Sequence, residues 1–215
     1  MRTVPTLLAL LTIPLILHGE EQAGQPASLS PDRKWEYRAT DEKAVLMRAG
    51  SDEQVLDLGD EIGEPANKTG QLVWAADSRR FAFNSRKGGK YYGCDLYELA
   101  EARWKKLPGL EHNNEVDQIL ERALRKAVKR LGAKQDEMNT VMTQWKVRRW
   151  IDNDTFEAYV GDARRVASKK DPDDWDYFGC ALLFRGKCDN RAGWKAASIR
   201  QLSDAEDEKI QKEDE

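Results

Sequence analysis

The stretch from Leu72 to Leu99 constrains the fold more than any other part of this chain. Phe81 and Phe83 alternate with small or polar residues, which is the two-residue period of a half-buried strand. The pair Gly88-Gly89 adopts positive φ at low cost and favours a tight hairpin. Residues 91–99 then supply the returning strand. The stretch predicts antiparallel β-structure and says little about chemistry.

The overall composition indicates one folded domain. A length of 215 residues is enough to bury a sizeable core. Charged residues make up 34%, but 40% hydrophobic residues with seven tryptophans argue against general disorder. The net charge of -3 gives no strong field for nucleic acid or an anionic membrane, so we expect no nucleic-acid partner. Local basic patches stay open.

The N-terminus has the layout of a secretory signal peptide over residues 1–19. A positive start is followed by an apolar run from Val4 to Leu17 and then by an abrupt polar end. The run is shorter than the roughly 20 residues of a membrane helix, and Pro5 and Pro14 interrupt it. We expect cleavage near Gly19, a periplasmic or secreted protein and no stable membrane span afterwards; the alternative is an uncleaved anchor.

The remaining chain predicts a flexible leader at 20–28, a single β-rich domain at 29–202 and a solvated, charged tail at 203–215. Within the domain, short alternating segments predict a first meander over 29–110 and a second over 144–202. Between them, apolar residues from Val116 to Leu131 recur at helical spacing and predict an amphipathic helix over 113–132. Met138, Val141 and Met142 suggest a second, short helix, and 161–174 looks like a charged loop.

The chain also contains an internal repeat. Ser30-Pro31-Asp32-Arg33-Lys34-Trp35 aligns without gaps on residues 75–80, and each copy opens a strand. A weaker echo lies at residues 150–156, with one residue missing. The motif resembles the S-P-D-G-[RK] turn of TolB-like β-propeller repeats over about residues 29–107, although neither copy has the Gly. The resemblance implies an exported scaffold protein.

We therefore predict an α+β fold: mainly antiparallel β meanders with one amphipathic helix between them. A propeller typically needs at least about four blades, and this chain has room for two or three. The meanders are accordingly expected to be propeller-like but not to close into a propeller, and to share one core.

The three cysteines leave their pairing open. Cys180 and Cys188 lie in one predicted strand, where about 3.3 Å per residue keeps them too far apart to bridge. A disulfide from Cys94 to either is geometrically open, and three buried thiols are the favoured alternative.

Few residues suggest catalysis, and we predict no catalytic, cofactor-binding or metal site. His112 is the one histidine beyond the signal peptide, so a histidine-activated nucleophile would have to use it. His and Cys show no zinc-ligand spacing, and no phosphate-binding glycine motif occurs. The aspartates at 171, 173, 174 and 176 are better explained by a solvated turn than by calcium. Arg122, Arg125, Lys126, Lys129 and Arg130 form one basic helix face, interpreted as solvated.

The best candidates for a partner surface are aromatic residues beside a cation, because aromatics and arginine dominate interaction hot spots. These are Tyr91, Tyr92, Tyr97, Trp104 and Arg86. Our leading hypothesis is a non-enzymatic exported protein that binds an envelope protein or peptide. The alternatives are a carboxylate-dependent hydrolase and a subunit whose sheet edge is completed by a partner chain.

Overall fold

The computed structural model describes residues 29–39, 43–59, 70–131, 138–168, 174–189 and 193–214. The predicted signal peptide and leader lie outside them. Three antiparallel strands form a small sheet in the order β1-β2-β3: β1 (Trp35–Ala39), β2 (Ala44–Arg48) and β3 (Gln54–Asp57).

The second sheet has eight strands in the order β11-β10-β9-β8-β6-β5-β4, with β7 paired to β6. Its strands are β4 (Gln71–Trp74), β5 (Arg80–Gly88), β6 (Tyr91–Ala100), β7 (Arg103–Lys106), β8 (Asn139–Trp150), β9 (Thr155–Ala167), β10 (Trp175–Asp189) and β11 (Gly193–Gln201). Mainly antiparallel β-structure is thus confirmed, and the described residues contain no closed or propeller-type sheet.

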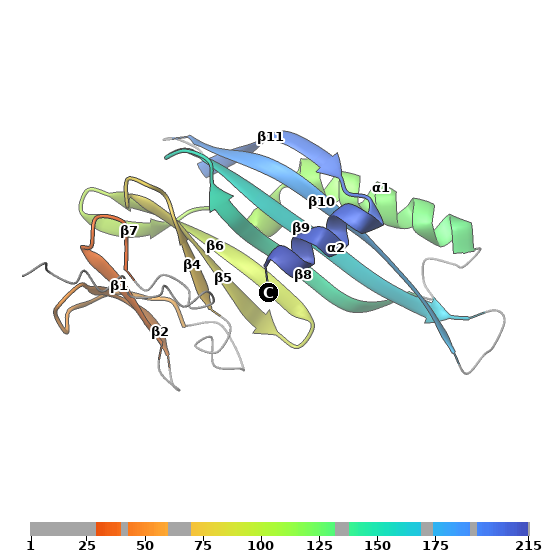
Figure 1. The fold of residues 1–215 in the computed structure, drawn as a ribbon, viewed down its shortest axis with the longest axis horizontal. Coiled ribbons are helices and arrows are strands. Elements are labelled where there is room, and N and C mark those ends of the chain that lie inside the picture. The colour runs from red at the N-terminus through yellow and green to blue at the C-terminus, as the bar shows by residue number, and fades with distance from the viewer. Residues whose placement is uncertain are drawn as a thin grey trace, which may run out of the picture.

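Two α-helices cover opposite faces of the strands β8 to β11 (Figure 1). Helix α1 (Asn114–Leu131) follows a 3-10 turn (Leu110–His112) and is the predicted amphipathic helix. It packs on Leu182 and Phe184 of β10, whereas α2 (Asp204–Glu213) packs on Ala181 and Leu183 of the same strand. The two-residue period of the strand places these pairs on opposite faces.

The predicted hairpin of β5 and β6 is present. Gly88 and Gly89 have φ values of 135° and 42°, the region that favours glycine. Phe81 and Phe83 lie fully buried between the two sheets, while Ala82 belongs to the core on the other face. The aromatic stripe in the sequence therefore marks the surface that the small sheet covers.

The first and second meanders meet at an unusual joint. β6 and β8 pair in parallel over only two residue pairs, Tyr91 with Thr143 and Tyr92 with Gln144. Further along, the buried side chain of Asn84 makes the hydrogen bonds to β8 that a neighbouring strand would make. Its Nδ2 donates to the carbonyl of Val147 at 2.8 Å, and its Oδ1 accepts from the Val147 N–H at 2.9 Å. One side-chain amide thus pairs with both backbone polar groups of Val147 in β8.

Two local predictions after the helix are wrong. The short helix expected at 138–142 is the start of β8, and the charged loop expected at 161–174 is strand as far as Ala167. The charges there hide a strand because they pair with one another: Arg164 Nε lies 2.6 Å from Asp162 Oδ1, and Val166 on the same face is buried. Pairing with β10 supplies the remaining stabilisation.

The tail is also more ordered than predicted. It forms the ten-residue helix α2, which opens with a capping box between Ser203 and Glu206. Ile210 is buried against the sheet, and the Tyr159 hydroxyl donates to Asp207 at 2.8 Å. Lys146 and Arg148 of β8 form ion pairs with Asp214. A charged segment can thus dock when its charges meet opposite charges on the strand beneath it.

The disulfide option is wrong as well, since Cys94, Cys180 and Cys188 are all free and buried. Burial raises the pKa of Cys94, and it raises the pKa values of Cys180 and Cys188 to about 12. The thiols therefore act as small core side chains.

Replacing Asn84 tests the joint. Asn84→Ala leaves a buried N–H and a buried carbonyl without partners, and we expect it to lower the free energy of unfolding by about 3 kcal/mol. Asn139→Ala, at an exposed position of β8, the strand that Asn84 of β5 contacts, is the control and is expected to cost within about 0.5 kcal/mol. Urea denaturation followed by tryptophan fluorescence measures both. Equal, small effects would contradict the role given to Asn84.

The capping box predicts how the stability of α2 changes at low pH. The backbone N–H and hydroxyl of Ser203, with Arg200, lower the pKa of Glu206 from 4.5 to about 2. The contribution of this carboxylate to α2 is therefore fully present above pH 4.5 and is lost as the pH falls toward about 2. NMR titration of the Glu206 carboxyl should show the low pKa, and Ser203→Ala should move it back toward 4.5. An unchanged pKa in Ser203→Ala would refute the assignment.

Candidate functional site: a groove between repeated turns

The three repeated segments found in the sequence share one hydrogen bond. In each, an aspartate accepts a hydrogen bond through Oδ1 from the backbone N–H two residues later: Asp32 at 3.1 Å, Asp77 at 2.9 Å and Asp152 at 2.8 Å. This is the Asx turn that aspartate favours. The repeat is thus a repeat of structure as well as of sequence, whereas the TolB-like family assignment stays a prediction.

In the S-P-D-G-[RK] motif a glycine follows the aspartate, whereas neither of the first two turns of this chain has glycine there. Arg33 and Ser78 occupy that position, and both have left-handed backbones with φ of 58° and 59°. Glycine adopts this region freely, whereas other residues are strained there. The backbone therefore has the conformation that a glycine at this position would favour.

The three turns lie against one another. The Asp32 N–H donates to Ser78 Oγ at 2.9 Å, and the Asp77 N–H donates to Asn153 Oδ1 at 3.2 Å. The first turn thus contacts the second, and the second contacts the third, although as many as 76 residues separate the partners. Together the three turns connect the small sheet, the β4–β5 hairpin and the β8–β9 hairpin.

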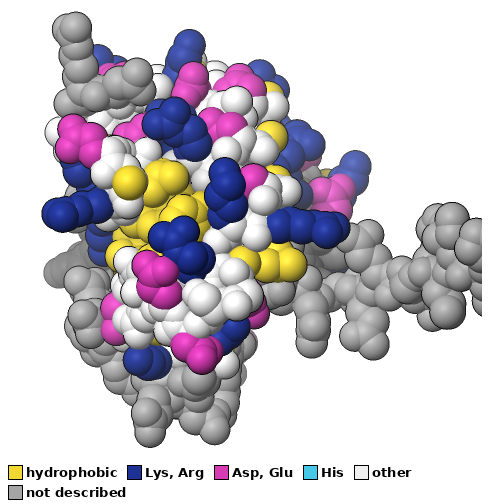
Figure 2. Space-filling model, turned by 90° about the vertical axis from the view of Figure 1, so that its left-hand side faces the viewer, with side chains coloured by type: hydrophobic (Ala, Val, Ile, Leu, Met, Phe, Trp, Pro, Cys, Tyr) yellow, Lys and Arg dark blue, Asp and Glu magenta, His cyan; other side chains and the backbone are white. Residues whose placement is uncertain are grey.

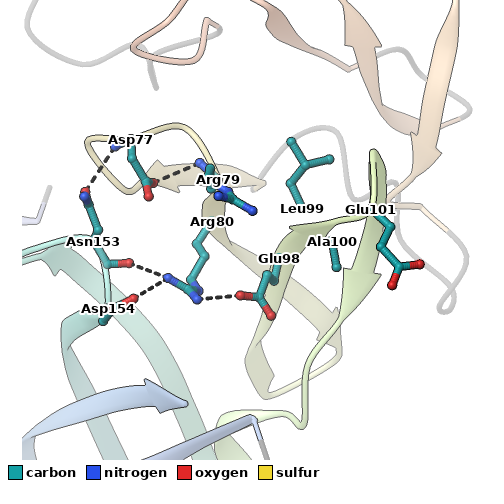
Figure 3. Close-up of a pocket in the computed structure, with 9 residues that line it drawn as sticks. All are labelled: Asp77, Arg79, Arg80, Glu98, Leu99, Ala100, Glu101, Asn153 and Asp154. Atoms are coloured by element: carbon teal, nitrogen blue, oxygen red, sulfur yellow. Dashed lines mark hydrogen bonds and ion pairs between the residues drawn. The ribbon is translucent and has the colours of Figure 1, made fainter. Parts of the chain in front are cut away.

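Arg80 anchors this arrangement from inside (Figure 3). Its side chain is only 8% exposed and forms ion pairs with Glu98 of β6 and Asp154 of the third turn, each at 2.5 Å. It also donates to the carbonyl of Asn153 at 2.9 Å. The two carboxylates share one guanidinium, so each forms a charge-assisted hydrogen bond to Arg80 within the fold.

A groove of about 510 Å³ opens beside Arg80. Its polar lining comes from the second and third turns and from Glu98 and Glu101, and its apolar lining comes from Leu99 and Ala100 at the end of β6. The exposed side chain of Arg79 borders it (Figure 3). Leu99 also packs against the aromatic core beneath the small sheet, so groove and core are continuous.

That aromatic core reaches the surface at the same end of the molecule. Figure 2 shows an apolar patch on this side, with lysine and arginine side chains around it. The half-buried apolar residues packed on the core are Val55, Leu56, Trp74, Leu99 and Trp104. The indole N–H groups of Trp74 and Trp104 are buried without an acceptor, whereas those of Trp150 and Trp194 donate to backbone carbonyls.

The predicted partner residues do not form one patch. Tyr97 is buried and stacks on Phe81 at 4.8 Å, and Trp104 packs edge-on against the same ring. Tyr91 is half-buried against the main core, while Arg86 lies over the ring of Tyr92 near the tip of the β5–β6 hairpin. Arg86 and Tyr97 also border a smaller pocket of about 240 Å³.

Sequence reasoning missed the groove itself. Arg80, Asn153 and Asp154 carry no catalytic or binding motif, and their roles depend on contacts between distant turns. The repeat was the available signal, because equivalent turns at the starts of neighbouring strands are expected to meet at one edge of a sheet.

The described residues include several groups that the sequence raised as candidates for metal binding or catalysis. No group of three or more His, Cys, Asp or Glu side chains among them is arranged to hold a metal ion. The buried carboxylate of Asp95, in the smaller pocket, is held by Lys87 at 2.5 Å and by Lys106 at 3.1 Å. His112 ends the 3-10 turn before α1, and the aspartates at 171 and 173 lie outside the described residues.

The strained turns give a paired prediction. Arg33→Gly removes left-handed strain at an exposed side chain, and we expect it to stabilise the fold by about 0.5 kcal/mol. Ser78→Gly removes the same strain but also the acceptor for the Asp32 N–H, and it should destabilise by about 1 kcal/mol. Thermal unfolding of both variants measures the difference. Shifts of the same sign would contradict the proposed contact between turns.

Comparison with protein-family models, with curated protein sequences and with solved structures gave no match. The geometry of the groove and its surroundings therefore carries the functional argument alone.

Proposed function

We propose that this chain is a non-enzymatic, exported binding or scaffold protein of the cell envelope that holds a protein or peptide partner at the groove between its turns. The observation that carries the proposal is the continuity of a polar groove with a half-buried aromatic patch at one end of the molecule. Interfaces commonly combine an apolar centre with a polar, charged rim. Export rests on the signal-peptide pattern of residues 1–19.

The arrangement of acids favours binding over the hydrolase alternative. A carboxylate pair that acts on a substrate must leave room for the scissile bond between its members. Glu98 and Asp154 instead have the Arg80 guanidinium between them. Raised thiol pKa values likewise make the buried cysteines poor nucleophiles at neutral pH.

Site-specific photocrosslinking in the native envelope tests this function. A photoreactive phenylalanine analogue replaces Arg79 or Arg103, both exposed beside the groove and patch, and Lys209 on α2 serves as the control position. We expect one partner to be captured from both test positions and not from Lys209. Lys90, beside Arg86 and Tyr92 on the hairpin tip, provides a second comparison.

Two results would overturn the proposal. Capture only from Lys90 would move the contact surface to the hairpin tip, and equal capture from all positions would indicate contacts without a defined surface. Substitution Arg79→Glu in the crosslinking variant at Arg103 adds a matched check, because a partner bound in the groove should then be captured several-fold less.

A further inference from the structure

Charge is divided between the two helices in a way that the proposed function does not explain. From Glu121 to Leu131, α1 carries five cations and one carboxylate. From Asp204 to Asp214, the α2 segment carries six carboxylates and two lysines. The two helices lie on opposite faces of the strands β8 to β11 (Figure 1), so the basic half of α1 and the acidic α2 are on opposite sides of these strands.

The cations of α1 are exposed and largely uncompensated. Arg125 pairs with Glu121 at 2.9 Å, and Arg122 donates to the carbonyl of Gln118. Within the described part of the chain, Lys126, Lys129 and Arg130 have no ion pair, although most charged residues of the strands have one. By contrast, α2 uses Glu206, Glu213 and Asp214 in ion pairs with arginine and lysine of the sheet.

The exposed face of α1 lacks the features of a specific protein interface. Its outward residues in this half are charged, and the one large apolar side chain is Leu131, which is 37% exposed at the helix end. Interface cores are depleted in charge and enriched in aromatic side chains. Single-stranded nucleic acid would need aromatic rings for base stacking, and the described part of this face has none beside the cations.

We propose that the basic face of α1 docks on a membrane surface rich in anionic phospholipid. Five cations within nine residues span roughly 13 Å of helix at about 1.5 Å per residue, a spacing that lets several reach a layer of headgroups together. The acidic α2 faces away from such a surface, so repulsion orients the molecule. Leu131 inserts between headgroups at the end of the helix.

This docking leaves the groove accessible, because the basic half of α1 and the groove lie at different ends of the molecule (Figure 1). It is a peripheral attachment, and it does not require a membrane-spanning segment. Among the described residues, no helix is long and apolar enough to cross a membrane. The inference stands independently of the partner proposed for the groove.

Vesicle sedimentation with the purified chain lacking residues 1–19 tests the docking. Vesicles of phosphatidylglycerol and phosphatidylcholine in equal parts are compared with phosphatidylcholine alone, at low and at high salt. We expect binding to the anionic vesicles only, with loss at high salt. The double substitution Lys126→Glu and Lys129→Glu should lower the partition coefficient by at least about 25-fold, since each lysine near such a surface contributes about a fivefold factor.

A charge-matched variant is the control. Lys105→Glu with Lys187→Glu makes the same change in net charge at exposed positions on β7 and β10, away from the basic half of α1, and should keep most of the binding. Equal loss in both double variants, or no binding of the unmodified chain at low salt, would overturn the proposal. So would tighter binding to a single-stranded oligonucleotide than to the vesicles, which would assign the face to a soluble polyanion.

Discussion

The side chain of Asn84 holds the described fold together at its weakest pairing. β6 and β8 share only two residue pairs, so the β8–β11 part and the β4–β7 part of the eight-stranded sheet meet in a short parallel contact. The Asn84 amide extends that contact by bonding to both polar groups of Val147. Packing of Ala82 and Leu96 with Val147 and Phe156 then forms one apolar core across the joint. An apolar residue at position 84 could pack there but would remove the partner of the Val147 N–H and carbonyl.

Arg80 performs a similar task at the edge of the same joint. It lies one residue before Phe81 and forms ion pairs with Glu98 of β6 and Asp154 of the third turn. These ion pairs hold the turns in place where the apolar core ends. A buried cation is tolerated only with such partners. Arg80, Glu98 and Asp154 also line the groove, so its shape depends on this ion-pair network.

Local sequence patterns predicted the local elements well. The period of Phe81 and Phe83, the Gly88-Gly89 hairpin and the helical spacing after Val116 each correspond to an observed element. Two kinds of pattern misled: alternating charges at Asp162 and Arg164 conceal a paired strand, and the acidic tail forms a docked helix. In both cases the stabilising partner comes from another strand, which no local window contains.

The arrangement of the strands in space was harder to predict than the strands and helices themselves. The sequence indicated meanders, but it did not indicate that the first three strands form a separate sheet, or that the remaining strands join through a side chain. The repeated turns were visible, yet the groove depends on contacts such as that of Asp77 with Asn153. The aromatic residues predicted as a partner surface are divided between the core and the hairpin tip, because successive side chains of a strand point to opposite faces of the sheet.

Amide hydrogen exchange at Val147 tests the central structural claim most directly. Its N–H donates to the Asn84 side chain at 2.9 Å, so its protection reports the joint between the two parts of the large sheet. The account predicts that this amide exchanges as slowly as the neighbouring amides bonded between β8 and β9. Exchange as fast as that of an exposed turn such as Gly89 would mean that the joint opens freely, and it would contradict a single shared core.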